Sequence, residues 1–246
     1  MPNIYESNFE AIIECALLAG GPDACEGVAP AVREIPTAYG TLTPGGYLRR
    51  PASDYDEELC LIPEDVVGFV QATQPKAWAT LRKLYGERTR TRFMRLLARE
   101  VDKRGTLDVL RKGIRDAGAR IKLVFFRPPT GLNPDLQTKY EANRFTVIRQ
   151  FTYSVKDKDA AHRKSIDLGL FLNGLPIFTA ELKNPLTGQT YKNAIHQYKT
   201  SRSDPQEPLL AFRRCLAHFA VDPDEVHFTT RLAGPKTRFF PFNQGR

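Results

Sequence analysis

The chain has 246 residues, of which 41% are hydrophobic and 26% are charged, and its formal net charge is +8. This composition is ordinary for a soluble globular protein with one large or two small domains, and the basic balance is consistent with a nucleic-acid partner. No apolar run approaches the ~20 residues of a membrane span, and the polar N-terminus MPNIYESNFE is not a secretory signal. Four scattered cysteines without a C-x-x-C pair predict neither a zinc site nor a disulfide framework, so we expect a cytoplasmic protein without membrane contact.

The first predicted element is a helix over residues 5–19, which buries its isoleucines and leucines and ends at Gly20-Gly21. Glu6, Glu10 and Glu14 recur at four-residue intervals and therefore project along one face. This acidic face is either solvated or part of a site.

The next hundred residues divide into an irregular part and a helical part. Residues 22–62 are rich in Pro, Gly and acids and show little periodicity, so they predict a long irregular segment. Residues 63–117 predict helices with breaks near Pro75 and Gly105.

Positive charge concentrates in residues 82–104, which hold nine Lys or Arg against three acids. On a helix, four arginines fall on one stripe and an apolar stripe lies opposite. The stripe is a solvated face, a contact for the DNA phosphate backbone, or a docking surface for another part of a larger protein. The four arginines are Arg88, Arg92, Arg95 and Arg99.

The remaining chain predicts an α/β core. The apolar segment 120–126 resembles a buried strand, and 144–155 predicts a long strand whose Arg149 and Gln150 could face DNA. The later predicted elements are strands at 165–172 and 175–183, a helix at 189–202, and strands at 214–220, 225–231 and 237–242.

Three charged residues stand at the ends of the two central predicted strands. Asp167 opens one apolar run, and Glu181 and Lys183 close the next. Two acids can hold a divalent cation, and a lysine can position or activate the attacking water. Such a set is what metal-dependent cleavage of a phosphodiester requires, although charges at strand ends are often merely solvated.

The register of the hairpin decides whether these residues can meet. Asn173-Gly174 is a strong turn signal, but a two-residue turn would place Asp167 opposite Ala180, on the other face from Glu181. A three-residue turn that begins at Leu172 shifts the register by one, so that Asp167 faces Thr179 and lies diagonal to Glu181.

We predict the three-residue turn, because it also gathers the apolar residues on one face; a two-residue turn would need a bulge elsewhere to restore the alignment. The apolar set is Ile166, Leu168, Leu170, Phe178, Ala180 and Leu182.

From its N-terminal helix to its end, and most closely over about residues 140–245, the chain resembles the N-terminal nuclease domain of the restriction (R) subunit of type I restriction-modification enzymes. The segments NRFTVIRQ, NGLPI and ELKNP carry this resemblance together. The domain belongs to the PD-(D/E)xK nuclease superfamily, which implies that Asp167 and Glu181 bind Mg²⁺ and that Lys183 is catalytic. The superfamily often lends one acid from the first helix, for which the spacing favours Glu10 and then Glu6.

The resemblance is incomplete on the helix that follows. Many relatives carry Gln-x-x-x-Tyr there, whereas here Gln197 is followed directly by Tyr198 and the fourth residue on is Ser201. Gln197 is expected to help hold the site or the DNA backbone. Tyr198 or Arg202 could take the place of the missing tyrosine.

The implied fold is a restriction-endonuclease-like mixed β-sheet flanked by helices, with residues 1–246 forming a single nuclease domain. Its core would comprise about 1–21 and 118–246, and a mainly helical insertion would occupy about 22–117. R subunits continue into an ATP-driven motor, but this chain has no G-x-x-x-x-G-K-[ST] loop, so we expect a fragment or natural truncation that lacks the motor and uses no ATP itself.

The expected activity is Mg²⁺-dependent hydrolysis of duplex DNA without sequence specificity of its own, in complex with methyltransferase and specificity subunits. One alternative is an inert DNA-binding or motor-docking module that acts only in the full complex. A weaker alternative is a stand-alone repair or junction nuclease. Metal binding at the three charged residues, and cleavage with and without the motor, would separate the first two.

Overall fold

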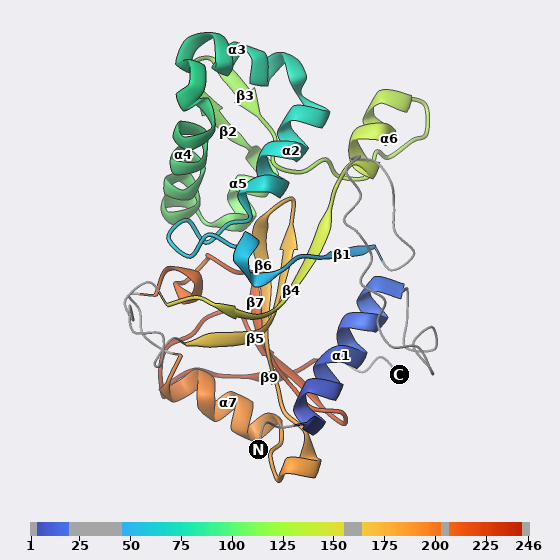
Figure 1. The fold of residues 1–246 in the computed structure, drawn as a ribbon, viewed down its shortest axis with the longest axis vertical. Helices are drawn as coiled ribbons and strands as arrows, with labels where there is room; N and C mark the ends of the chain where they lie inside the picture. Colours follow the sequence, from blue (N-terminus) through green and yellow to red (C-terminus); the bar gives the residue numbers. More distant parts are fainter. Residues whose placement is uncertain (1–3, 20–45, 155–163, 203–206, 243–246) are drawn as a thin grey trace.

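A computed structural model describes residues 4–19, 46–154, 164–202 and 207–242 (Figure 1). Within these residues the main sheet has seven strands in the order β1-β4-β5-β6-β7-β8-β9. The β1–β4 and β6–β7 pairs are parallel and the other pairs are antiparallel, so the predicted mixed α/β fold is confirmed. The strands are β1 (Tyr47–Arg49), β4 (Phe145–Thr152), β5 (Ser165–Leu172), β6 (Leu175–Leu182), β7 (Ala217–Val221), β8 (Val226–Thr229) and β9 (Phe240–Pro241).

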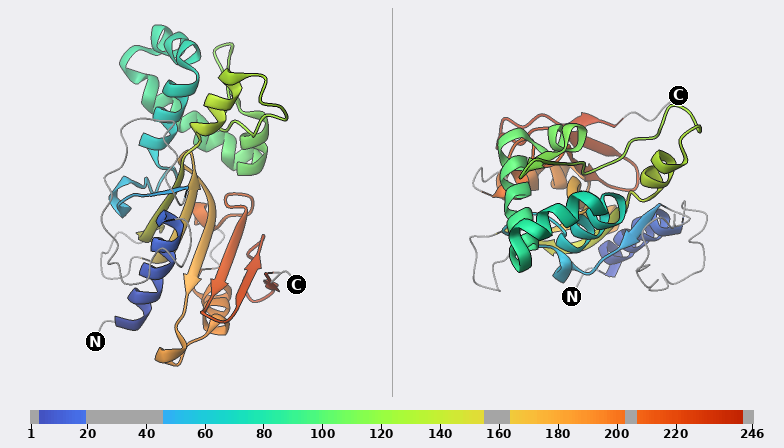
Figure 2. Two further views of the ribbon diagram at one scale, coloured as in Figure 1. Left: turned by 90° about the vertical axis from the view of Figure 1, so that its right-hand side faces the viewer. Right: turned by 90° about the horizontal axis from the view of Figure 1, so that it is seen from above.

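The helices form two groups along the sheet. Figures 1 and 2 show α2–α5 gathered at one end and α1 beside the other. The predicted breaks near Pro75 and Gly105 are confirmed, because α2 gives way to α3 there and Gly105, at φ +85°, separates α4 from α5. The helices are α1 (Ile4–Ala19), α2 (Pro63–Thr73), α3 (Pro75–Tyr85), α4 (Thr89–Arg104), α5 (Thr106–Lys112), α6 (Pro134–Glu141) and α7 (Tyr191–Thr200).

The predicted strand at 120–126 is largely wrong. Only its first residues belong to a strand, β3 (Ala119–Ile121), which pairs with β2 (Ile114–Asp116) in a separate two-stranded sheet. The following apolar residues Leu123, Val124 and Phe125 are buried among the helices without strand pairing. A short apolar run indicates that a segment is buried, but periodicity alone does not predict which backbone conformation the buried segment adopts.

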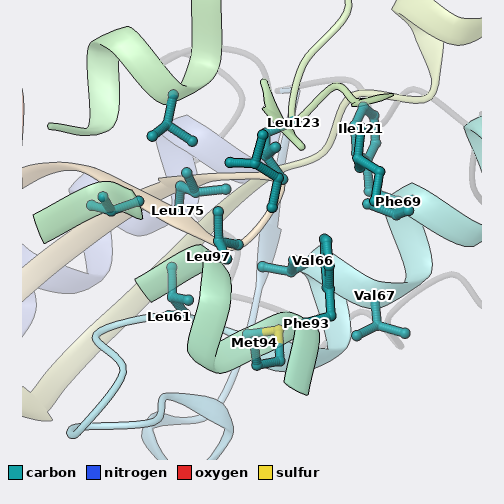
Figure 3. Close-up of a cluster of buried hydrophobic side chains, with 14 of the residues drawn as sticks. Leu61, Val66, Val67, Phe69, Phe93, Met94, Leu97, Ile121, Leu123 and Leu175 are labelled. Atoms are coloured by element: carbon teal, nitrogen blue, oxygen red, sulfur yellow. The ribbon is translucent and has the colours of Figure 1, made fainter. Parts of the chain in front are cut away.

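The largest apolar cluster joins the helices to the turn end of β6 (Figure 3). Leu175 and Ile177 of β6 pack there with residues such as Val66 of α2 and Leu97 of α4. A Cβ on Gly174 would lie 2.4 Å from the Ile62 carbonyl oxygen, so only glycine allows α2 to approach the turn this closely. The helical group therefore anchors one end of β6 and leaves the other end to the charged residues.

No described helix is both long and apolar enough to cross a membrane. Cys60 and Cys215 are free and buried, as expected for small apolar side chains. Cys15 is disulfide-bonded, but a single bridge is not the disulfide framework that the sequence argues against.

Candidate active site

The turn between β5 and β6 has two residues, not the predicted three. Leu172 pairs directly with Leu175, and Asn173 and Gly174 both have positive φ, at 50° and 81°. Positive φ at both central positions is the requirement of the turn that matches strand twist in a two-residue hairpin. Asn173 is also buried, and its side chain accepts a hydrogen bond from the Arg144 backbone N–H at 2.7 Å. This tertiary contact fixes the turn.

A bulge then restores the alignment that the charged residues need. The register shifts between Leu170 and Phe171, where Phe171 faces Pro176, a residue without an N–H to give to the ladder. Beyond the bulge Leu168 pairs with Ala180. Continued by one residue, this register sets Asp167 directly opposite Glu181, and the two lie on the same face.

Two members of the predicted apolar face belong elsewhere, and one of them, Phe178, packs against the helical cluster. Leu168, Ala180 and Leu182 share a cluster with residues of α1, but Ile166 packs in a different cluster with Phe151. The neighbouring strand is irregular at Gln150, whose φ is +46°. That left-handed residue breaks the alternation of side chains just where the site begins.

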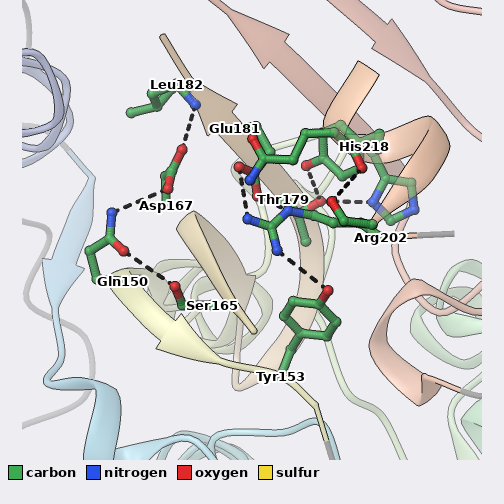
Figure 4. Close-up of polar contacts among 12 residues, drawn as sticks. Gln150, Tyr153, Ser165, Asp167, Thr179, Glu181, Leu182, Arg202 and His218 are labelled. Atoms are coloured by element: carbon green, nitrogen blue, oxygen red, sulfur yellow. Dashed lines mark hydrogen bonds and ion pairs between the residues drawn. The ribbon is translucent and has the colours of Figure 1, made fainter. Parts of the chain in front are cut away.

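Where β5 and β6 separate, the Asp167 carboxylate replaces a backbone carbonyl as the hydrogen-bond acceptor for β6. Its Oδ2 accepts a hydrogen bond from the backbone N–H of Leu182 at 2.8 Å, and its Oδ1 accepts one from Gln150 Nε2 at 3.2 Å (Figure 4). The aspartate is therefore oriented by the backbone of the strand that carries Glu181.

Gln150 links the first helix to this carboxylate. Its Nε2 also donates to Glu10 Oε1 at 2.6 Å, so one amide group joins Glu10 and Asp167. Burial raises the pKa of Glu10, and the negative charge of Asp167 adds to the increase. Gln150 itself has a positive φ, which strains the backbone of a non-glycine residue, and such strain is often found at functional sites.

Of the three glutamates on α1, Glu10 is the one that the structure links to the site. Glu14 instead forms ion pairs with Arg49 at 3.1 Å and with Arg149 at 3.1 Å. The side chain of Glu6 lies outside the described residues. Arg149 also forms an ion pair with Glu10 at 3.0 Å, so its guanidinium neutralises this acidic face.

Glu181 is fully buried and is held by an arginine. Arg202 Nε lies 2.6 Å from Glu181 Oε1, and Arg202 Nη2 donates to Oε2 at 3.1 Å. Burial raises the pKa of Glu181 well above its ordinary value, and the charge of Asp167 raises it further. Arg202 and Lys183 act in the opposite direction.

Lys183 follows β6 directly and is 8% exposed. Its backbone N–H donates to the Val221 carbonyl oxygen at 2.9 Å, which extends the β6–β7 pairing past the strand end. Because the lysine charge lowers the pKa of Glu181, the ammonium lies within electrostatic reach of that carboxylate. The structure thus brings Asp167, Glu181 and Lys183 to one end of the sheet.

Tyr198 of α7 and Arg202, in the turn after it, contact the site strand, whereas Gln197 does not. Tyr198 is buried, and its hydroxyl lies 2.9 Å from the Thr179 hydroxyl on β6. Within the described chain the Gln197 side chain is half-buried and makes no hydrogen bond. The two residues proposed as substitutes for the missing tyrosine are therefore the ones that reach the site strand.

Sequence reasoning missed His218. Its Nδ1 lies 2.7 Å from the Thr179 hydroxyl, and burial lowers its pKa to about 4, so the ring is neutral. The contact depends on parallel pairing of β6 with β7, which sets Thr179 beside His218. No spacing between histidines could have revealed it, because the partners are a threonine and a tyrosine.

The residues fit a magnesium ion by donor type. Carboxylate oxygens are preferred by Mg²⁺, which usually takes one or two of them and fills its other positions with water and phosphate oxygens. A cation between Asp167 and Glu181 would relieve their repulsion in a buried place. Among the described residues no group of three or more acids, histidines or cysteines forms a ready metal site, so Glu10 would act through Gln150 unless α1 moved.

A mixed sheet with an aspartate, a buried glutamate and a lysine at the ends of adjacent strands defines a restriction-endonuclease-like α/β protein. The family model for the type I restriction enzyme R protein N terminus matches residues 73–237, about two thirds of the chain. The chain belongs to this family.

A curated relative supports the same assignment. A stretch of 62 residues is 37% identical to a candidate type I restriction enzyme endonuclease subunit (MjaIXP) of Methanocaldococcus jannaschii. That stretch is 25% of this chain and 6% of the relative, so the chain matches only a small part of that protein. The search of solved structures found no match.

Proposed function

We propose that the chain is the Mg²⁺-dependent endonuclease domain of a type I restriction enzyme R subunit, which hydrolyses duplex DNA without sequence specificity of its own. The observation that carries the proposal is the meeting of Asp167, Glu181 and Lys183 where β5 and β6 separate. Its proposed partners are duplex DNA and the methyltransferase and specificity subunits.

The chemistry assigns a role to each group. Asp167 and Glu181 would hold the ion, which lowers the pKa of bound water and offsets charge on the phosphate. Lys183 Nζ would donate a hydrogen bond to the attacking water or to a phosphate oxygen. Water adds to phosphorus, the bond to the leaving sugar oxygen breaks, and that oxygen takes up a proton. The Leu182 N–H keeps Asp167 oriented throughout.

The test is Mg²⁺-dependent nicking of supercoiled plasmid by the wild type, Asp167→Ala and Lys183→Ala. We expect cleavage by the wild type and a loss of at least about a hundredfold in each variant. Lys192→Ala, an exposed lysine on α7, is the matched control and should cut normally. Undiminished cutting by Lys183→Ala would overturn the assignment.

The pairing of Glu181 with Arg202 favours a second candidate, a module that is inactive until the full complex rearranges it. Both carboxylate oxygens lie near the guanidinium, so Arg202 and a metal ion compete for the same group. Titration calorimetry with Mg²⁺ separates the two candidates. Binding by the wild type that is lost in Asp167→Ala supports the nuclease, whereas absent binding together with absent nicking supports the dependent module.

A further inference from the structure

The outer face of α4, together with the short turn that precedes it, carries a cluster of exposed arginines. Arg88, Arg92, Arg95 and Arg99 are exposed and line one groove of about 740 Å³. The other described residues of the lining are Leu59, Thr91 and Ala98, so no acid faces the groove from the described chain.

These arginines differ from their neighbours in lacking carboxylate partners. Arg90 pairs with Glu64 at 2.5 Å, and Arg104 pairs with Glu100 at 2.8 Å and with Asp108 at 2.7 Å. Within the described residues, the four groove arginines form no ion pair. Four like charges on one surface repel one another, and an anionic ligand relieves this cost.

The helix under the groove is rigid. Phe93, Met94, Leu97 and Val101 are buried in the largest apolar cluster, so the opposite face of α4 is fixed. The Arg92 guanidinium lies 4.4 Å from the centre of the Tyr85 ring, which restricts it further. The backbone positions of the four arginines are therefore fixed relative to one another, although ordering their exposed side chains on binding still costs entropy.

We propose that this arginine groove is a second DNA-binding surface, which holds the phosphate backbone of a duplex away from the catalytic residues. The four arginines span about 16 Å along the helix, a length of duplex axis that carries about ten negative charges. Guanidinium groups bind phosphate oxygens in a bidentate manner, and the Thr91 hydroxyl can add a donor.

The lining suits contacts to the phosphate backbone, which need only the four arginines, more than contacts to base edges. Apart from arginine and threonine it offers only aliphatic side chains, with no Asn or Gln to pair with adenine and no aromatic ring for base stacking. Its position is also fixed: α4 packs on the turn end of β6, whereas Asp167 and Lys183 lie at the other end of that eight-residue strand. A duplex held at both places would lie along the molecule.

The experiment compares two doubly substituted full-length chains of equal net charge. Arg92→Gln/Arg95→Gln removes the centre of the groove, and Arg115→Gln/Arg120→Gln removes two exposed arginines of β2 and β3. Binding of a short fluorescent duplex of arbitrary sequence is followed by anisotropy in EDTA, between roughly 50 and 200 mM salt. Thermal unfolding by circular dichroism confirms that both variants fold.

We expect the groove variant to bind about tenfold more weakly at low salt, with a salt slope smaller by about 2, and the control to resemble the wild type. Equal losses in both variants, or none in the groove variant, would overturn the proposal. If the groove variant bound duplex normally but lost binding of polyglutamate, the groove would be a docking site for an acidic protein surface instead. Because EDTA removes catalysis, this outcome is independent of whether the chain cuts DNA.

Discussion

The two ends of β6 show opposite uses of burial. At the turn end, Leu175 and Ile177 join an apolar cluster built from four helices and the small sheet. At the other end, Glu181 and Lys183 are almost as deeply buried, but their surroundings are charged and hydrogen-bonded. Apolar burial stabilises a fold, whereas burial of charge costs free energy even when partners are present. One strand therefore joins a stabilising region to a site that is held at a cost.

The largest effect should come from the helical end. Phe93 is 1% exposed, and its ring meets Trp78 edge to face at 5.5 Å. Phe93→Ala should lower the free energy of unfolding by about 3–5 kcal/mol through lost contacts and a cavity. Guanidinium unfolding measures it, and Arg95→Gln on the exposed face of the same helix should stay within about 0.5 kcal/mol. A loss below about 1 kcal/mol for Phe93→Ala would mean that stability does not reside at this end.

A second effect should appear at the site end when the pH falls. Burial lowers the pKa of His218 to about 4, below the ordinary value of 6.5. As the pH falls, the unfolded chain is therefore protonated at this residue before the folded protein is. The stability that depends on the neutral ring is fully present above pH 6.5 and is lost as the pH falls toward 4. The loss attributable to His218 should be about 3 kcal/mol.

The measurement is the free energy of unfolding across this pH range for the wild type and His218→Gln. The difference between them should shrink as the pH falls, because glutamine does not titrate. His196→Gln, an exposed histidine on α7, should leave the wild-type pH dependence unchanged. Parallel curves for the wild type and His218→Gln would show that folding does not lower the pKa of this ring.

Local patterns in the sequence predicted the elements of both ends but not how they fit together. The strands at 165–172 and 175–183 were predicted almost to the residue, since alternation and the Asn-Gly turn are local signals. A bulge was considered only as the alternative to a three-residue turn. Its place at Phe171 could not be predicted, because which residue faces Pro176 depends on the pairing with the partner strand. Arg202 was named only through the family resemblance and His218 was missed, because both reach the site through packing of elements that are distant in sequence.

The smallest change in stability should accompany a complete loss of activity. Asp167→Asn keeps an oxygen to accept the Leu182 N–H but removes the negative charge that raises the pKa of both Glu10 and Glu181. Relief of that repulsion should raise the free energy of unfolding by about 0.5–2 kcal/mol at neutral pH, as is typical when a functional site loses its strained group. Urea unfolding at neutral pH, set beside the plasmid-nicking assay, measures both effects on one protein. A destabilised Asp167→Asn variant would mean that the aspartate charge supports the fold. The charged end of β6 would then stabilise the protein as the apolar end does, and the contrast between the two ends would be wrong.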